Sequence, residues 1–195
     1  MNKNIISYPN WVKKLLGQPG IILALIWGIA EGSFFFIVPD MIISLAALFD
    51  AKKSFAHLCA VTVGAIVAGT MLFVWATADS KKAIDTILKV PFVSTQMYEK
   101  VNVDYKKHGA WALCLGPTSG IPYKLYSVIA PEYVSYPAFI LVSIPARLER
   151  LIITWAMFSG LGLILNRWGK YKFSIGIGLY IIYWATIYHL YLGKI

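Results

Sequence analysis

The sequence predicts an all-α integral membrane protein with two inverted units, each a re-entrant helical hairpin followed by a membrane span. Of its 195 residues, 58% are hydrophobic and only 14% are charged. A soluble domain of this size would carry far more polar surface. Apolar blocks with the length of membrane helices recur along the chain. Two of these blocks contain glycine, proline and ionisable residues in their interior, which favours broken helices over plain spans.

The N-terminal residues 1–19 are expected to form a short amphipathic helix along the membrane interface. Their apolar residues accompany Lys13 and Lys14, and no apolar segment precedes the lysines, so the stretch is not a signal peptide. The net charge of +9 indicates contact with anionic lipid headgroups. No basic cluster with interleaved aromatic residues stands apart from the apolar blocks, so we do not expect a nucleic-acid partner.

The first apolar block covers residues 20–49 and contains the stretch "AEGSFFFIVPD". As a single helix it would be about 45 Å long, whereas the hydrocarbon core is about 30 Å thick. Two full crossings would need about 40 residues and a turn. The block therefore predicts a re-entrant hairpin that turns between "EGS" and "PD", with Gly32 and Pro39 as turn residues.

A short polar loop, "DAKKS", separates this hairpin from a span at residues 55–78, in which Gly64 and Gly69 provide a surface for close helix packing. Residues 79–108 form a polar surface segment. Apolar side chains recur there at helical spacing, which predicts amphipathic helices on the membrane surface, broken near Pro91.

A second hairpin is expected at residues 109–130, where "GPTSGIPYK" interrupts the apolar sequence. Pro117, Gly120 and Pro122 are the predicted turn residues. A second span at residues 137–165 follows.

A basic loop, "NRWGKYK", comes after the second span, and a final transmembrane helix covers residues 173–192. The units 20–78 and 109–165 thus repeat the order of hairpin and span. With one span in each unit, the two have opposite orientation, as in transporters whose site lies where broken helices meet near the midplane.

Positive charges flank the first hairpin at Lys13, Lys14, Lys52 and Lys53, which favours a cytoplasmic N-terminus. Arg167, Lys170 and Lys172 then lie on the same side, and the six lysines of residues 79–108 lie on the other. In a bacterium, such a protein belongs in the inner membrane.

Two carboxylates stand in the first block. An ionisable group near the bilayer centre costs at least about 2.5 kcal/mol, so it is expected to be paired or to serve a function. Glu31 either carries a proton, caps a helix or forms a structural ion pair. Asp40 follows Pro39, so it either shares this role or only caps the next helix.

The cations stand in the second unit. Lys124 follows a helix break at Pro122 and is placed to hold a phosphate, with Tyr123 as a second donor, unless the lysine extends to the surface. Arg147 and Arg150 share a helix face. They pair the carboxylates or bind a headgroup, unless Pro145 begins a new helix and places both at the interface.

An intramembrane protease is an alternative, because "GPTSG" is similar to the nucleophile loop of rhomboid proteases and His189 lies in the last span. The spacing differs by one residue, and Ser119 suits a turn. We expect no catalytic residues, no metal site and no cofactor, since metal-binding and phosphate-loop motifs are absent from the sequence.

Three stretches in order resemble one family across roughly residues 20–165: "AEGSFFFIVPD", "HGAWALCLGPTSGIPYKLYSVIAPE" and "YPAFILVSIPARLERLIITW". They are similar to motifs of the DedA superfamily (SNARE-associated Golgi protein, or VTT-domain, proteins), in its YqaA-like branch. The resemblance implies two facing re-entrant hairpins and translocation of a polyprenyl phosphate or a phospholipid. It assigns the family's acidic residues to Glu31 and Asp40, and its basic residues to Lys124, Arg147 and Arg150.

The expected function is therefore a membrane transporter for a lipid or a lipid phosphate, with protons as candidate coupling ions. Anionic lipids are the expected partners, and a homo-oligomer stays open. The alternatives are a membrane-organising protein without transport, in which the charges are structural, and, more remotely, an intramembrane serine protease.

Overall fold

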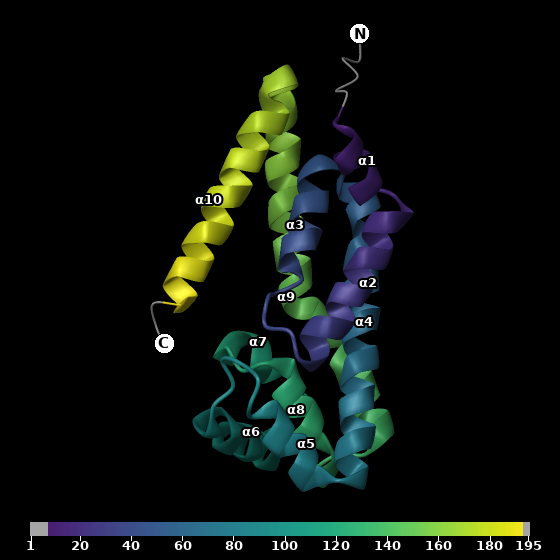
Figure 1. Ribbon diagram of the computed structural model, residues 1–195, viewed down its shortest axis with the longest axis vertical. Coiled ribbons are helices and arrows are strands. Elements are labelled where there is room, and N and C mark those ends of the chain that lie inside the picture. Colours follow the sequence, from purple (N-terminus) through teal and green to yellow (C-terminus); the bar gives the residue numbers. More distant parts are fainter. Residues whose placement is uncertain (1–7, 193–195) are drawn as a thin grey trace.

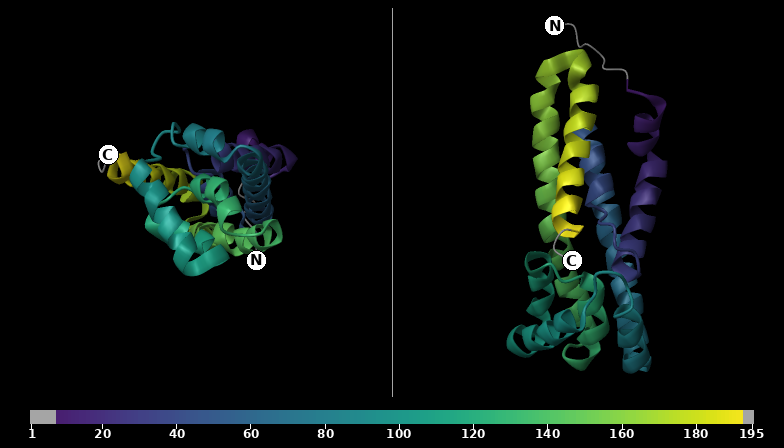
Figure 2. Two further views of the ribbon diagram at one scale, coloured as in Figure 1. Left: turned by 90° about the horizontal axis from the view of Figure 1, so that it is seen from below. Right: turned by 60° about the vertical axis from the view of Figure 1, so that its left-hand side comes forward.

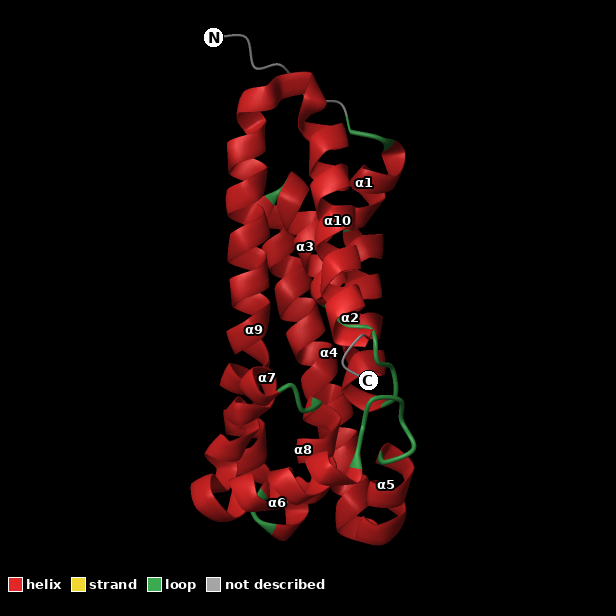
Figure 3. Cartoon of the chain, turned by 90° about the vertical axis from the view of Figure 1, so that its left-hand side faces the viewer, coloured by secondary structure: helices red, strands yellow, loops and turns green. Residues whose placement is uncertain are grey.

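The computed structural model describes residues 8–192, and every regular element in that range is a helix (Figure 3). Three helices are long and apolar enough to cross a membrane: α4 (Ala51–Ala78), α9 (Tyr136–Leu165) and α10 (Lys172–Leu192). They coincide with the three predicted spans. The all-helical class is confirmed, and the three apolar helices are consistent with an integral membrane protein.

The first apolar block forms two helices that run in opposite directions, α2 (Gln18–Ser33) and α3 (Asp40–Phe49) (Figure 1). The turn begins later than predicted, because α2 continues through Gly32. A Cβ atom on Gly32 would lie 2.8 Å from the Cβ of Ala68, so this glycine serves helix packing and not the turn. Pro39 stands directly before α3, as a turn residue should.

Within the predicted N-terminal segment, α1 covers Asn10–Leu15. Residues 1–7 of this segment lie outside the described residues. The loop "DAKKS" is shorter than predicted. The side chain of Asp50 accepts a hydrogen bond from the backbone N–H of Lys53 at 3.0 Å and caps α4, which therefore begins at Ala51.

Close backbone contact joins α2 to α4 along their length. A Cβ atom on Gly28 would lie 2.4 Å from the carbonyl oxygen of Val61, and one on Gly64 would lie 2.3 Å from that of Leu25. Only glycine fits at such an approach. The close packing predicted for both glycines is confirmed, since Gly64 lies against α2 and Gly69 lies against Tyr123.

The surface segment forms α5 (Ser80–Ile87) and α6 (Thr95–His108), separated by a break that contains Pro91. Both helices pack against the second hairpin with their apolar sides (Figure 2). The Tyr105 hydroxyl donates to the carbonyl oxygen of Tyr126 at 2.9 Å, and the Tyr126 hydroxyl donates to Asp104 at 2.8 Å. The amphipathic faces predicted to meet lipid are thus engaged with protein.

The second apolar block contains only short helices: η1 (Gly109–Leu115), α7 (Gly116–Ser119), α8 (Tyr123–Ile129) and η2 (Ala130–Glu132). Gly120 has a φ of 72°, which ends α7, and Pro122 precedes α8. Pro117 lies in α7, next to the break. All residues of α8 are buried, and at about 10 Å it is far too short to cross a bilayer.

Helix α9 runs through Pro145 without a break, so the hypothesis of a new helix at this proline is wrong. Arg147 and Arg150 therefore lie in the middle of a long helix. Beyond α9, the predicted basic loop is a 3-10 helix, η3 (Asn166–Tyr171), with Gly169 at a φ of 54°. It turns the chain into α10.

The long helices and hairpin arms pack in a crossed pattern. The first arm of each hairpin packs on the long helix of its own unit, α2 on α4 and η1 on α9. The second arms also contact the long helix of the other unit, α3 on α9 and α8 on α4, although α3 lies against α4 of its own unit as well. The turn from α9 to α10 and the beginning of α4 lie at the end that carries α1, and α5 and α6 lie at the opposite end (Figure 1).

Candidate functional site

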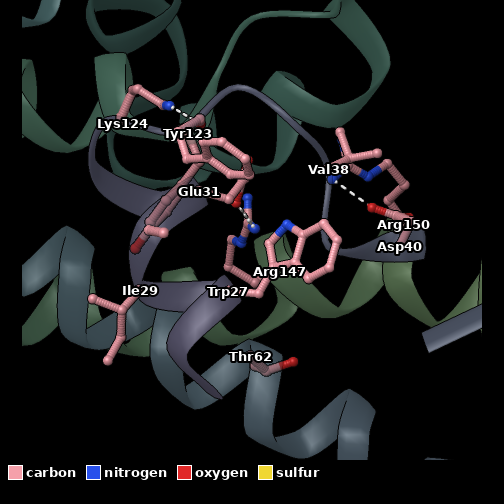
Figure 4. A network of polar contacts seen from close by, with 12 residues as sticks. Trp27, Ile29, Glu31, Val38, Asp40, Thr62, Tyr123, Lys124, Arg147 and Arg150 are labelled. Carbon is pink, nitrogen blue, oxygen red and sulfur yellow. Dashed lines mark hydrogen bonds and ion pairs between the residues drawn. The ribbon is translucent and has the colours of Figure 1, made fainter. Parts of the chain in front are cut away.

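The two hairpin tips meet beside the middle of α9, and the predicted charges gather there (Figure 4). Glu31, in the last turns of α2, accepts a hydrogen bond from Nη2 of Arg147 at 2.5 Å. The side chains of this pair are only 9% and 7% exposed, respectively. Glu31 is therefore paired across two elements and does not cap a helix.

Asp40 is the first residue of α3, and its carboxylate also turns toward α9. One oxygen accepts from Arg150 at 2.9 Å, and the other accepts from the hydroxyl of Thr154 at 2.9 Å. The Asp40 side chain is 3% exposed, and that of Arg150 is 38% exposed. Because both oxygens are used by α9, the hypothesis that Asp40 only caps its helix is wrong.

Lys124 joins the tips of the two hairpins directly. Its ammonium group donates to the carbonyl oxygen of Phe35, in the loop between α2 and α3, at 2.7 Å. The residue is 3% exposed, so it does not extend to the surface. A carbonyl oxygen satisfies one of the three N–H groups of lysine and leaves its charge without a carboxylate partner in this contact.

Tyr123 supports Arg147. Its hydroxyl donates to Oγ of Ser143 at 2.8 Å, and its ring lies 5.0 Å from the centre of the Arg147 guanidinium, a cation–π contact. Gly69 of α4 makes room for this ring, since a Cβ atom there would lie 2.5 Å from the tyrosine oxygen.

These groups surround a cavity of about 170 Å³. Its charged lining consists of Glu31, Lys124, Arg147 and Arg150. Nε of Arg147 is buried and has no hydrogen-bond partner. A buried donor without a partner carries a desolvation penalty of about 1–3 kcal/mol, which a bound anion or water would relieve. Three cations against two carboxylates leave one positive charge, so the site favours an anion.

The sequence did not predict five further contributors: Ser143, Thr154, the carbonyl group of Phe35, and Ile187 and Tyr188 of α10, which line the cavity. The sequence did contain a pattern that could have identified Ser143 and Thr154. Ser143, Arg147, Arg150 and Thr154 follow one another at helical spacing and form one polar stripe on α9. The carbonyl and the α10 residues carry no such signal, since their place depends on tertiary packing.

Other predicted groups lie elsewhere. The hydroxyl of Ser119 donates to the carbonyl oxygen of Gly116 at 3.2 Å, and His189 is exposed on α10. The contacts described for residues 8–192 contain no Ser119–His189 pair. Glu149 is exposed on α9. Within the described part of the chain, no group of three or more His, Cys, Asp and Glu side chains is arranged to hold a metal ion.

The chain matches no protein-family model, no curated protein and no solved structure.

Proposed function

We propose that this protein is a DedA-type membrane transporter that moves a lipid phosphate, either a polyprenyl phosphate or a phospholipid, across the bilayer. The observation that carries the proposal is the cationic cavity between the two hairpin tips, which is lined by Arg147, a residue whose buried Nε has no hydrogen-bond partner. A phosphate oxygen accepts hydrogen bonds from guanidinium and ammonium groups, and this cavity presents both.

The exposed apolar side chains of α4 support a site within the bilayer. The exposed large apolar residues of this helix extend from Phe55 to Val74, a length of about 28 Å, close to the hydrocarbon thickness of about 30 Å. Gly32, the residue after Glu31, lies against Ala65 and Ala68 near the middle of this band. On this placement α2 ends near the midplane, and the chain turns back there as a re-entrant hairpin.

The crossed packing of the hairpin arms supports an inverted repeat. An exchange of the two units maps α3 on α9 to α8 on α4, and α2 on α4 to η1 on α9, whereas the contact of α3 with α4 has no counterpart of similar extent between α8 and α9. Both second arms also begin directly after a proline, at Pro39 and Pro122. Backbone that is not helical at membrane depth is tolerated where protein or a cavity covers it, and here the two tips cover one another.

In the proposed cycle, Glu31 and Asp40 neutralise the arginines while the site is empty. A phosphate group enters the cavity, binds Lys124, and competes with Glu31 for the guanidinium group of Arg147. Protonation of the released carboxylate removes its charge and completes the exchange, which would couple transport to a proton gradient.

The test is lipid translocation in proteoliposomes, with and without a pH gradient. We expect Glu31→Gln and Arg147→Ala to reduce the rate at least about tenfold, corresponding to about 1.4 kcal/mol. Glu149→Gln and Arg167→Ala alter exposed residues of the same types and should retain the rate. Unchanged translocation in both site variants would refute the assignment.

A membrane-organising protein without transport is the second candidate. The full pairing of both carboxylates with arginines favours it, because structural ion pairs have the same geometry. Both candidates predict that the site variants lower thermal stability. The membrane-organising protein is distinguished by its wild type, which should move no lipid under any gradient.

A further inference from the structure

A second cavity lies between α9 and α10, and its lining is apolar except for one tyrosine hydroxyl. We call it the α9–α10 groove. It encloses about 350 Å³ and is formed by Met157, Phe158 and Leu161 of α9 and by Leu179, Ile182 and Tyr183 of α10. Both helices are long and apolar enough to cross a membrane, so a groove between them would be open to hydrocarbon.

The groove continues the face of α9 that carries the cations. At about 3.6 residues per turn, the α9 residues that line the charged cavity and those that line the groove fall within about a third of the helix circumference. Met157 lies about 15 Å beyond Arg147 along the helix axis. On α10, Ile187 and Tyr188 line the charged cavity, about one turn from Tyr183 of the groove.

The way α10 is attached leaves the outer part of this groove open, while the rings of Phe158 and Tyr183 contact each other between the two helices, with centroids 5.2 Å apart. Three aromatic side chains, one on each successive turn of α10, bond to α3 and the loop before it. Tyr180 donates to the carbonyl oxygen of Met41 at 3.1 Å, Trp184 donates to Ser44 at 3.1 Å, and the Tyr188 hydroxyl accepts from the backbone N–H of Val38 at 3.2 Å. No residue of the groove lining takes part in these three bonds.

We propose that the α9–α10 groove holds the hydrocarbon tail of the lipid whose phosphate occupies the charged cavity. This inference rests on the proposed function and specifies its substrate as an amphiphile with a long alkyl or prenyl chain. One leaflet of the hydrocarbon core is about 15 Å thick, half of about 30 Å, and this equals the axial distance from Arg147 to Met157. The tail therefore extends from the site toward the end of the molecule that carries α1.

Photo-crosslinking in nanodiscs tests where the tail lies. The probe is hexadecyl phosphate with a diazirine at the end of its chain. We expect adducts on Met157, Leu179 and Ile182, and competition by unlabelled hexadecyl phosphate but not by hexadecanol. Leu163 is the reference position, because it is 65% exposed on α9 and does not line the groove. Equal labelling of Leu163 would mean surrounding lipid only and would overturn the inference.

Filling the groove gives an independent measurement. Met157 and Leu179 are 45% and 41% exposed, so Met157→Trp combined with Leu179→Trp should fold. We expect this variant to bind hexadecyl phosphate at least about tenfold more weakly, about 1.4 kcal/mol, and to bind ethyl phosphate as the wild type does. Leu163→Trp is the matched control and should bind both as the wild type does. A dimer cross-linked through the groove would show a second copy there and would also overturn the inference.

The two proposals fail in different ways. If Lys124→Gln and Arg147→Ala leave the binding of both phosphates unchanged, the proposed phosphate site is wrong. If those variants lose both ligands while the two tryptophans change neither affinity, the phosphate site stands and only the tail site is wrong.

Discussion

The two carboxylates of the site differ in how firmly they are held. Asp40 uses both oxygens, one for Arg150 and one for Thr154, and it does not line the cavity. Glu31 lines the cavity, and the hydrogen bond described for its side chain goes to Arg147. Glu31 is therefore the carboxylate that an incoming anion would displace, and Asp40 is a positioning residue for Arg150.

Breaking the Glu31–Arg147 pair from one side should destabilise the protein strongly. Glu31→Gln leaves a buried guanidinium without its counter-charge, at a cost of about 3 kcal/mol in the free energy of unfolding. Adding Arg147→Met should recover part of this loss, because an apolar pair of similar size needs no counter-charge. The measurement is the free energy of unfolding in mixed detergent for Glu31→Gln, for Arg147→Met and for the double variant. A double variant as unstable as the sum of the single ones would contradict this pairing.

The Thr154 hydroxyl is expected to hold Asp40 in place. Thr154→Val keeps the shape of the side chain and removes the hydrogen bond to Asp40, at a cost of about 1–3 kcal/mol in unfolding free energy. Thr77→Val is the control, because Thr77 is exposed and donates only to Phe73 of its own helix. Equal stability of the two variants would show that Asp40 does not depend on Thr154.

At the scale of elements, glycine determines where helices approach. Gly28 and Gly64 bring α2 onto α4, and Gly162 brings α9 onto α3, where a Cβ atom would lie 2.4 Å from the carbonyl oxygen of Leu48. In lipid no hydrophobic driving force brings helices together, so close backbone contact of this kind stabilises their packing through van der Waals interactions. Because Glu31 and Asp40 lie on α2 and α3, this packing sets the position of both carboxylates relative to α9.

A methyl group at these positions should separate the helices. Gly28→Ala would place a Cβ atom 2.4 Å from backbone, which cannot rotate away, so we expect a loss of at least about 1–3 kcal/mol in stability, typical of overpacking. Gly160→Ala is the matched control in α9, where no atom lies within 4 Å of the added Cβ. That control should be neutral or stabilised by up to about 1 kcal/mol. The thermal midpoint in detergent compares them.

At the scale of the whole molecule, α4 and α9 connect the two ends, whereas α10 extends from the α1 end only as far as the site (Figure 1). One end carries α1 and the turn between α9 and α10, and the other carries α5 and α6, whose contacts with α8 brace the second hairpin tip (Figure 2). The site lies between these ends, where neither hairpin alone provides all of its charges.

The proposed topology places Lys53 and Lys100 on opposite sides of the membrane, with Lys53 in the cytoplasm. Both residues are exposed. In a protein in which alanine replaces Cys59 and Cys114, we expect Lys100→Cys to react with an impermeant maleimide in intact cells, and Lys53→Cys only after permeabilisation. Reaction of both cysteines from one side would refute the crossing by α4. The reverse pattern would invert only the orientation.

Much of this protein followed from its sequence alone. Composition and block length identified the helical membrane class and the long helices, because an apolar stretch of membrane length has few stable alternatives. Comparing the length of the first block with the thickness of the hydrocarbon core also distinguished this interrupted block from the continuous spans. The charges of the site were visible as ionisable residues in apolar surroundings, where each needs a partner or a role.

Which charge meets which partner was decided only by tertiary structure. The sequence left Asp40 as a cap or a site residue, Lys124 as a ligand or a surface residue, and Pro145 as a helix interior or a beginning. In each case the local preferences are balanced, and contacts between distant segments decide, such as Thr154 with Asp40 and Lys124 with Phe35. Local sequence encodes helices and turns, whereas the cavity exists only because the two hairpin tips meet beside α9.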